Sequence, residues 1–290
     1  MIRKLIMSGL AAFILGACTA NETILIEPVQ ELDQLQDVLT TSLQDGTHFA
    51  LEEEFDENGW KRFVEIVVEE SQIVAVTFDA VNEFAATFKA DISYSGIDIF
   101  SEDDDHPLRW DQQMTVLEQF ILDHQGIDDL NGNAAPFLEA FTLELAPYVE
   151  LFNVAVGTGP LEAGPYLDGR YFMAQELLVG EYDDYQYFIN MIVRHGYIIA
   201  VHWNAINSEG VRKYEPILPG SILDTEDEAL MWRAQADLME AHLLSTQDPT
   251  QMTFDEDELS QELFGVDIPI QSFIELAVSA LAAGPILETN

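Results

Sequence analysis

Two stretches of the chain, "DENGWKRFVEIVVEESQIVAVTFDAVN" (56–82) and "EYDDYQYFINMIVRHGYIIAVHWNAIN" (181–207), follow one pattern 125 positions apart. Aligned without gaps, they share identical residues at Phe63/Phe188, Val68/Val193, Ile73/Ile198, Ala75/Ala200, Val76/Val201, Ala80/Ala205 and Asn82/Asn207. Most of the other positions are conservative exchanges, such as Trp60 for Tyr185. Self-similarity on this scale indicates two copies of one module and not a solenoid of short units.

Each copy predicts a β-hairpin or meander. Asp45-Gly46 and Asp168-Gly169 are turn signals that precede a strand. Two apolar runs then follow in each copy, separated by Glu70-Ser71-Gln72 in the first and by Arg194-His195-Gly196 in the second. The runs alternate in polarity, which is typical of strands with one buried face.

Helical patterns follow each hairpin, so the sequence predicts an α+β fold of two tandem modules, each a small antiparallel sheet with attached helices. The expected helices are Met114–Leu122, Pro136–Leu145, Glu226–Leu244 and Ile270–Leu281. A Gly- and Pro-rich segment, 154–167, is the expected linker. The expected organisation is a signal peptide (1–17), a tether (18–30), a first module (31–153), this linker, a second module (168–284) and a tail (285–290).

The N-terminal sequence "MIRKLIMSGLAAFILGACTA" has the plan of a secretory signal. Two basic residues precede an apolar stretch that is too short to span a bilayer stably, and small residues then lead to Cys18. Cys18 is the only cysteine of the chain, and the stretch resembles a bacterial lipobox. The resemblance implies acylation of Cys18 and a lipid-anchored protein of the cell envelope. By resemblance to Gram-negative sorting patterns, Thr19 favours the outer membrane.

The charge of the chain excludes some partners. Its formal net charge is −42, with 53 acidic and 11 basic residues, so it repels nucleic acid phosphates, and we expect no nucleic acid partner. A hydrophobic content of 48% nevertheless predicts a folded core. The acidic runs 101–106, 224–228 and 254–258 lack the Gly and Glu spacing of a calcium loop, and no histidine pair has zinc spacing. We therefore expect no metal.

The first module resembles the small FMN-binding domains of bacterial extracytoplasmic flavoproteins. The likeness lies in the hairpin ending "FDAVN" and in "FKADISY", where Lys89, Asp91 and Tyr94 have a K-x-D-x-x-Y spacing. It is closest to tandem-domain lipoproteins implicated in extracellular electron transfer. Asp79 and Lys89 are the polar residues expected to meet near a ligand, although an ion pair at the edge of the meander is an equally good interpretation.

In that family, a threonine in a Ser-Gly-Ala-Thr-like turn before a helix carries the flavin through a phosphoester. The first module keeps a small-residue turn, Asn131-Gly132-Asn133, without a hydroxyl before Pro136. In the second module, Ser272 aligns with a serine of the helix and not with the acceptor. The resemblance therefore implies FMN that is bound non-covalently, with Asn131, Gly132, Asn133, Asp79 and Lys89 as candidate binding residues.

No catalytic residues are predicted, because no nucleophile elbow, P-loop or dinucleotide fingerprint is present. A flavin-binding or electron-transfer protein is thus a better expectation than a stand-alone enzyme. Two hypotheses stay open. One is a membrane-anchored flavin carrier or electron-transfer relay with redox partners, and the other is a flavin-free scaffold or interaction lipoprotein of the cell envelope.

Overall fold

The computed structural model describes residues 43–85, 87–94, 108–127, 130, 141–176, 185–214 and 227–286. The chain divides into two compact units, Met1–Ser42 and Leu43–Asn290, and both sequence repeats lie in the second. Cys18 and Asn131–Asn133 lie outside the described residues. The fold is α+β, as predicted, with two three-stranded antiparallel sheets and several helices.

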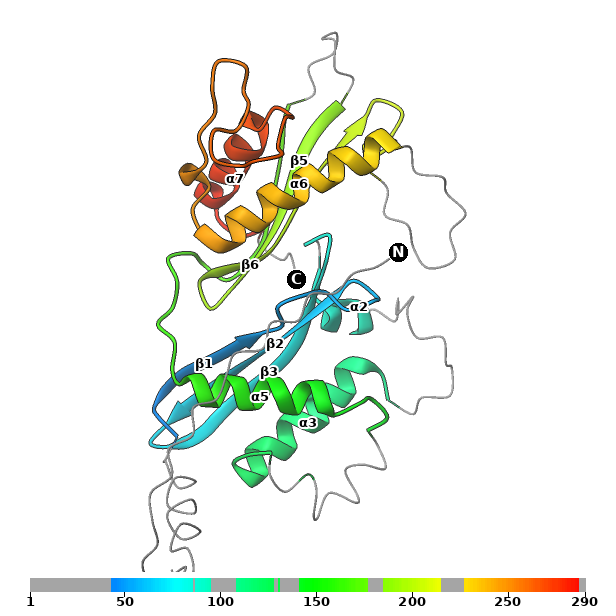
Figure 1. Cartoon of the computed structure of the whole chain (residues 1–290). Helices are drawn as coiled ribbons and strands as arrows, with labels where there is room; N and C mark the ends of the chain where they lie inside the picture. The colour runs from blue at the N-terminus through cyan, green and yellow to red at the C-terminus, as the bar shows by residue number, and fades with distance from the viewer. Residues whose placement is uncertain are drawn as a thin grey trace, which may run out of the picture. The chain divides into compact units, whose positions relative to one another are not determined.

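The first repeat (residues 43–161) begins with a meander and continues with helices (Figure 1). Its strands, in the sheet order β1-β2-β3, are β1 (Gly46–Leu51), β2 (Trp60–Glu69) and β3 (Gln72–Asn82). Its helices are α2 (Lys89–Tyr94), α3 (Trp110–His124) and α5 (Ala146–Thr158). Helix α3 packs on β3, and α5 packs on β1 and β2.

The second repeat (residues 166–286) has the same plan. Its strands, in the order β4-β5-β6, are β4 (Gly169–Ala174), β5 (Tyr185–Arg194) and β6 (Tyr197–Asn207). Its helices are α6 (Asp227–Thr246), the short 3₁₀ helix η2 (Pro249–Gln251) and α7 (Gln271–Ala283). Helix α6 packs on β6, and α7 packs on β4 and β5.

The two hairpins have one register. Trp60 pairs with Asn82 in the first and Tyr185 with Asn207 in the second, so the 125-residue offset of the sequence persists in the pairing. The register shifts between Val67 and Val68 and again at the equivalent step in β5. Such a bulge inserts one unpaired residue and increases the local twist. The sequence predicts the hairpins but not the bulge.

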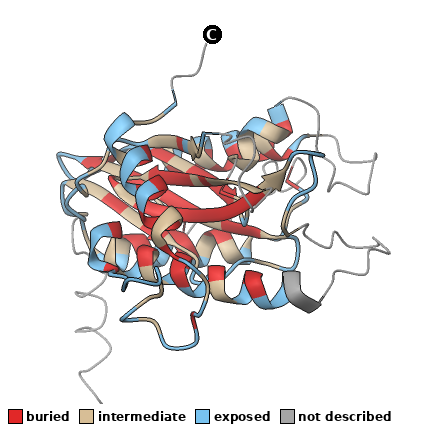
Figure 2. Ribbon diagram, turned by 90° about the horizontal axis from the view of Figure 1, so that it is seen from above, coloured by how far each residue is buried: buried red, intermediate tan, exposed pale blue. Residues whose placement is uncertain are grey.

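Each sheet buries one face under its own helices. The first core includes Val64, Ile66 and Phe78 of the strands with Leu117 of α3 and Leu151 of α5. The second core repeats this arrangement around Trp203. Figure 2 shows the pattern, with buried residues along the strands and on one side of the helices. A third cluster joins the two repeats through Phe63, Val81 and Ala85 of the first and Ile192, Ile199 and Ala200 of the second.

Side chains from the helices occupy the open edges of β3 and β6. Gln125 accepts a hydrogen bond from the N–H of Ile73 (2.7 Å) and donates to its carbonyl (3.1 Å), while Glu118 accepts from the N–H of Phe78 (2.8 Å). Gln247 and Glu240 make the equivalent contacts to β6. An unpaired strand edge is a template for aggregation, so these contacts protect the edges of both sheets.

Each repeat ends with a Gly-Pro strap that returns to its first strand. After α5, Gly159-Pro160 leads to Leu161, whose N–H donates to Thr47 of β1 (2.8 Å). After α7, Gly284-Pro285 leads to Ile286, whose N–H donates to Arg170 of β4 (2.7 Å). The straps need glycine at the start of the strand, because a Cβ on Gly46 would lie 2.8 Å from the ring of Pro160. The segment expected as a linker therefore begins inside α5 and includes the end of the first repeat.

The helix predictions were partly wrong. Helices α3, α6 and α7 confirm the predicted segments. Helix α3 is longer at both ends, whereas α6 and α7 begin one residue later and end two residues later than predicted. Residues 136–140 of the helix predicted at Pro136–Leu145 lie outside the described residues, whereas residues 141–145 are not helical, and α5 begins only at Ala146. Helix α5 contains β-branched residues and a glycine, which favour a strand or a loop locally, but it buries Tyr148, Leu151 and Phe152 against the sheet. Tertiary packing overrides weak propensity in such a case.

Candidate functional site

A lysine amine lies over aromatic rings at the same place in both repeats. The Nζ of Lys89 is 5.2 Å from the ring centre of Trp60 and 5.6 Å from that of Trp110. The Nζ of Lys213 is 5.2 Å from the ring of Tyr185 and 5.5 Å from that of Trp232. We call these the first and second amine–aromatic clusters. Because a ring face attracts cations, each cluster holds a fixed positive charge at the start of β2 or β5.

One polar side chain positions each lysine. The Oδ1 atom of Asp79 accepts from the N–H of Ala80 (2.7 Å) and from that of Ala90 (3.0 Å), the residue after Lys89. Asn204, the equivalent of Asp79, accepts from Ala205 (2.8 Å) and from Tyr214 (3.2 Å), the residue after Lys213. The structure therefore places the carboxylate of Asp79 beside the backbone of the residue that follows Lys89.

Asp79 is buried, with 7% of its surface exposed. Burial raises the pKa of Asp79 to about 6, although the N–H groups of Ala90 and Ala80 and the charge of Arg194 favour its ionised form. Arg194 belongs to the second repeat, so the charge of Asp79 is linked to the contact between the repeats.

A glutamine fixes the turn before the last helix of each repeat. The Oε1 atom of Gln113 accepts from the N–H of Thr142 (2.8 Å) and from that of Leu143 (3.2 Å). In the second repeat, the Oε1 atom of Gln235 accepts from the N–H of Asp267 (2.7 Å). Thr142 and Asp267 therefore occupy equivalent positions, each four residues before its helix. Both side chains are exposed, one as a hydroxyl and the other as a carboxylate.

The turn before the last helix of the first repeat therefore contains a hydroxyl, that of Thr142, which lies after Pro136 and not before it. The helix that corresponds to α7 is α5, so the turn to compare lies at residues 141–145 and includes Thr142. The sequence reveals this only with a second offset. At an offset of 122 positions, the two repeats share four residues of this region, which are Trp110/Trp232, Gln113/Gln235, Glu118/Glu240 and Gln125/Gln247.

The first amine–aromatic cluster and the Thr142 turn share helix α3. Trp110, under Lys89, donates through Nε1 to the hydroxyl of Tyr148 in the first turn of α5 (3.1 Å). Gln113, one turn later on α3, holds Thr142. The Trp110–Tyr148 hydrogen bond therefore joins the first turns of α3 and α5, both of which carry partial positive charge, and Lys89 lies over Trp110.

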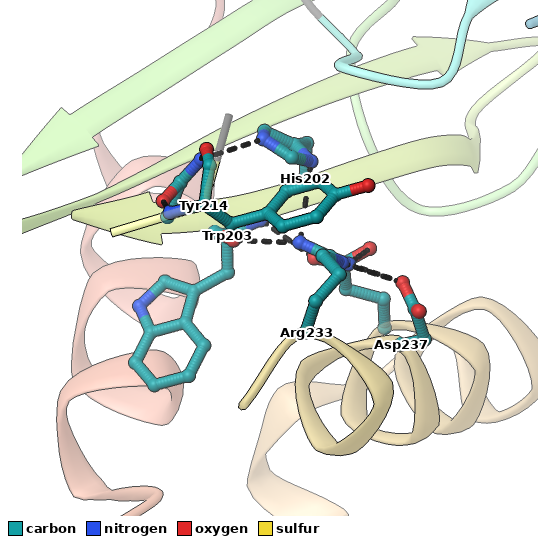
Figure 3. A network of polar contacts seen from close by, with 7 residues as sticks. His202, Trp203, Tyr214, Arg233 and Asp237 are labelled. Carbon is teal, nitrogen blue, oxygen red and sulfur yellow. Dashed lines mark hydrogen bonds and ion pairs between the residues drawn. The ribbon is translucent and has the colours of Figure 1, made fainter. Parts of the chain in front are cut away.

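In the second repeat, Arg233 stands where the first repeat has Asp111, and it forms a buried ion pair with Glu240 (Figure 3). Arg233 of α6 donates to the carbonyl of Trp203 (2.9 Å) and forms ion pairs with Glu240 (2.5 Å) and Asp237 (2.6 Å). Its NH1 atom also lies 3.4 Å from Nδ1 of His202. Burial raises the pKa of Glu240 to about 7 and lowers the pKa of His202 to about 3. His202 lies on β6, and its ring faces Phe84 of the first repeat, with ring centres 5.3 Å apart.

We expect stability to fall as pH rises from about 4.5 to about 7. The pKa values of Asp79, Glu118 and Glu240 are raised to about 6, 7 and 7, so the folded chain binds these protons more tightly than the unfolded chain. The stabilisation is present below their ordinary pKa values and is lost as pH rises through the raised ones. His202 has the opposite sign, because its lowered pKa adds stability as pH rises to 6.5.

Thermal unfolding as a function of pH checks this expectation. Glu118→Gln keeps an oxygen for the N–H of Phe78 but cannot titrate. The melting temperature of this variant should therefore fall less steeply between pH 4.5 and pH 7 than that of the wild type. A melting temperature that rises between pH 5 and pH 7 would contradict the assignment of these three carboxyl groups.

The described residues contain no group of three His, Cys, Asp or Glu side chains that could hold a metal ion. Within the same residues, no helix is both long enough and apolar enough to cross a membrane.

Comparison with known proteins gives no family. No family model matches the chain, and no curated protein matches it. A solution NMR structure of a Clostridium thermocellum protein from a structural genomics consortium is 28% identical over 42% of this chain and 95% of its own, with a TM-score of 0.32. A crystal structure of a Clostridium perfringens protein from the same consortium is 16% identical over 40% of this chain and 88% of its own, with a TM-score of 0.29. At these TM-scores, neither match carries an argument about function.

Proposed function

We propose that this chain is a lipid-anchored protein of the cell envelope that binds FMN reversibly in its first repeat and serves as a flavin carrier or electron-transfer relay. The anchor is Cys18. The proposal rests on the resemblance of the hairpin to FMN-binding domains. The observation that carries it is the difference between two equivalent positions, where Thr142 offers a hydroxyl and Asp267 offers a carboxylate.

The first repeat fits the phosphate of FMN. Lys89 supplies a positive charge, and the ends of α3 and α5 supply partial positive charge. The exposed hydroxyl of Thr142 donates to Oε1 of Gln113 (3.3 Å) and would turn from it to the phosphate. The N–H groups of Thr142 and Leu143 are already bonded to Gln113, so they are not offered to a phosphate. This turn therefore lacks the backbone cradle that a phosphoester on Thr142 would need, which supports reversible binding.

The second repeat fits FMN poorly. Asp267 stands where the first repeat has Thr142, and its carboxylate opposes a phosphate dianion. We therefore assign one flavin to each chain, in the first repeat, and a structural role to the second. A bound flavin would supply the redox chemistry, and the chain's own residues would hold its phosphate.

A flavin-free scaffold is the second candidate. It is favoured by the burial of the aromatic rings of the first cluster, since Trp60 is 2% exposed and Trp110 is 5% exposed. A flavin ring would have to stack elsewhere or displace Lys89. The net charge of −42 also opposes an anionic ligand at long range.

Two matched lysine variants test the proposal. We expect Lys89→Gln to weaken FMN binding about tenfold, the effect of losing one charged contact of about 1.4 kcal/mol, and Lys213→Gln to leave it unchanged. Quenching of flavin fluorescence in a titration measures both affinities. Riboflavin, which lacks the phosphate, should bind wild type and Lys89→Gln equally. Equal effects of the two lysine variants would contradict the assignment to the first repeat.

A further inference from the structure

The two repeats contact each other through different parts of the module that they share. The first repeat contributes the outer face of its sheet, with Phe63 and Val81 fully buried. The second contributes the region around its β5–β6 turn, with Ile199 and Ala200 at 2% and 1% exposure. A contact between non-equivalent surfaces of two similar units is heterologous. It leaves two surfaces unused, the outer sheet face of the second repeat and the hairpin turn of the first.

Charged and aromatic groups add to this contact. The guanidinium carbon of Arg194 lies 5.5 Å from the ring centre of Phe63 and 5.4 Å from that of Phe88. His195 stacks on Phe49, with ring centres 6.1 Å apart. The positive β5–β6 turn thus covers an aromatic face that also carries Asp79.

The unused face lies on the second repeat. Phe172, Phe188 and Ile206 correspond to Phe49, Phe63 and Val81. Phe172 is 48% exposed and lies 6.1 Å from Phe188, which is half-buried like Ile206. We call these three residues the open aromatic face.

The unused turn lies on the first repeat. Val74 and Ala75 correspond to Ile199 and Ala200, and both are exposed, Val74 at 47%. Glu69 and Glu70 correspond to Arg194 and His195. We call these four residues the open turn.

The open turn and the open aromatic face carry complementary charges. Within the chain, a basic turn covers a face that carries an acidic group. In the unused pair, the turn is acidic and a basic group lies beside the face. The open turn carries Glu69 and Glu70 where the β5–β6 turn carries Arg194 and His195. Beside the open aromatic face, Arg212 takes the place of Phe88, as the matching bridges Val81–Phe88 and Ile206–Arg212 show. Asn204 takes the place of Asp79, so the acidic group that the positive turn faces is absent on this side.

We propose that the open turn of one copy of this chain docks on the open aromatic face of a second copy, which repeats between chains the contact that joins the two repeats within a chain. Because this contact is heterologous, it leaves one free half at each end and can continue beyond two copies. By the same equivalence, Glu69 would lie near Phe188 and Arg212 of the second copy, and Glu70 would lie beside Phe172. The net charge of each chain limits the association at low salt.

Sedimentation equilibrium of the full-length chain carrying Cys18→Ser tests the proposal. At about 0.15 M salt, where the Debye length is ~8 Å, we expect the average mass to rise with concentration past that of a dimer. Phe172→Ser and Val74→Ser should each weaken association at least about tenfold, as the loss of one interface anchor does. Leu238→Ser, a change at a similarly exposed apolar residue of α6, should have no effect.

A mixture of the two variants gives the sharpest result. Phe172→Ser retains the open turn and Val74→Ser retains the open aromatic face, so together they should form dimers that do not grow further. Glu69→Arg and Arg212→Glu should each weaken association, and the double variant should recover it. A chain that stays monomeric at every concentration, or that associates equally in the Phe172→Ser variant, would overturn the proposal.

Discussion

Replacing Glu240 with leucine is expected to lower the free energy of unfolding by about 3–5 kcal/mol, the cost of leaving one partner of a buried ion pair behind. Arg233 is 8% exposed, and Asp237, whose side chain is 61% exposed, would be the acidic group left beside it. The N–H of Trp203 would also lose its acceptor. Denaturant unfolding monitored by tryptophan fluorescence measures the change.

The first repeat provides the matched control. Glu118 accepts from Phe78 as Glu240 accepts from Trp203, but position 111 is an aspartate where the second repeat has Arg233. Glu118→Leu should therefore cost only about 1–3 kcal/mol, the penalty for one unsatisfied buried N–H. Adding Arg233→Met to Glu240→Leu should restore part of the loss. Equal costs for the two single variants would show that the ion pair contributes nothing specific.

Phe63→Ala is expected to destabilise the protein by about 3–5 kcal/mol, because it removes a large ring from a closed site. Phe63 has no exposed surface, and it contacts Phe49 and Phe88 of its own repeat and Arg194 of the other. The loss should fall on the contact between the repeats, so calorimetry should show two separate transitions where the wild type shows one.

Phe188→Ala is the control for this change. It is the repeat equivalent of Phe63 on the open aromatic face and remains half-buried, so its removal should cost about 1 kcal/mol. If both variants cost the same, or if Phe63→Ala leaves a single transition, the contact between the repeats is not the source of the stability.

The sequence predicts the hairpins well because local rules govern them. Turn residues and alternating polarity specify a meander, and two similar copies make the pattern easy to see. The repeated bulge, which leaves Val74 of β3 and Ile199 of β6 without a partner on the neighbouring strand, is not visible in this way, because a one-residue shift in pairing leaves the composition of the strands unchanged. Helix α5 escapes prediction for a different reason, since its sequence is helical only because the sheet buries one of its sides.

The candidate site was predicted in part. Asp79 and Lys89 lie on adjoining segments, and the spacing from the hairpin brings the aspartate to the backbone beside the lysine. Gln113 and Thr142 were missed because they come from separate elements and meet only through tertiary packing. Matching Trp110 and Gln113 to Trp232 and Gln235 at the 122-residue offset would have shown that α3 is repeated.

Native mass spectrometry of the full-length chain with excess FMN, followed by denaturation of the same sample, tests the central claim most directly. We expect one FMN per chain in the native spectrum, and no FMN on the denatured chain even after expression in a host with a flavin transferase. Absence of FMN from the native spectrum would contradict the carrier and favour the scaffold. FMN retained on the denatured chain, and lost in Thr142→Ala, would contradict reversible binding.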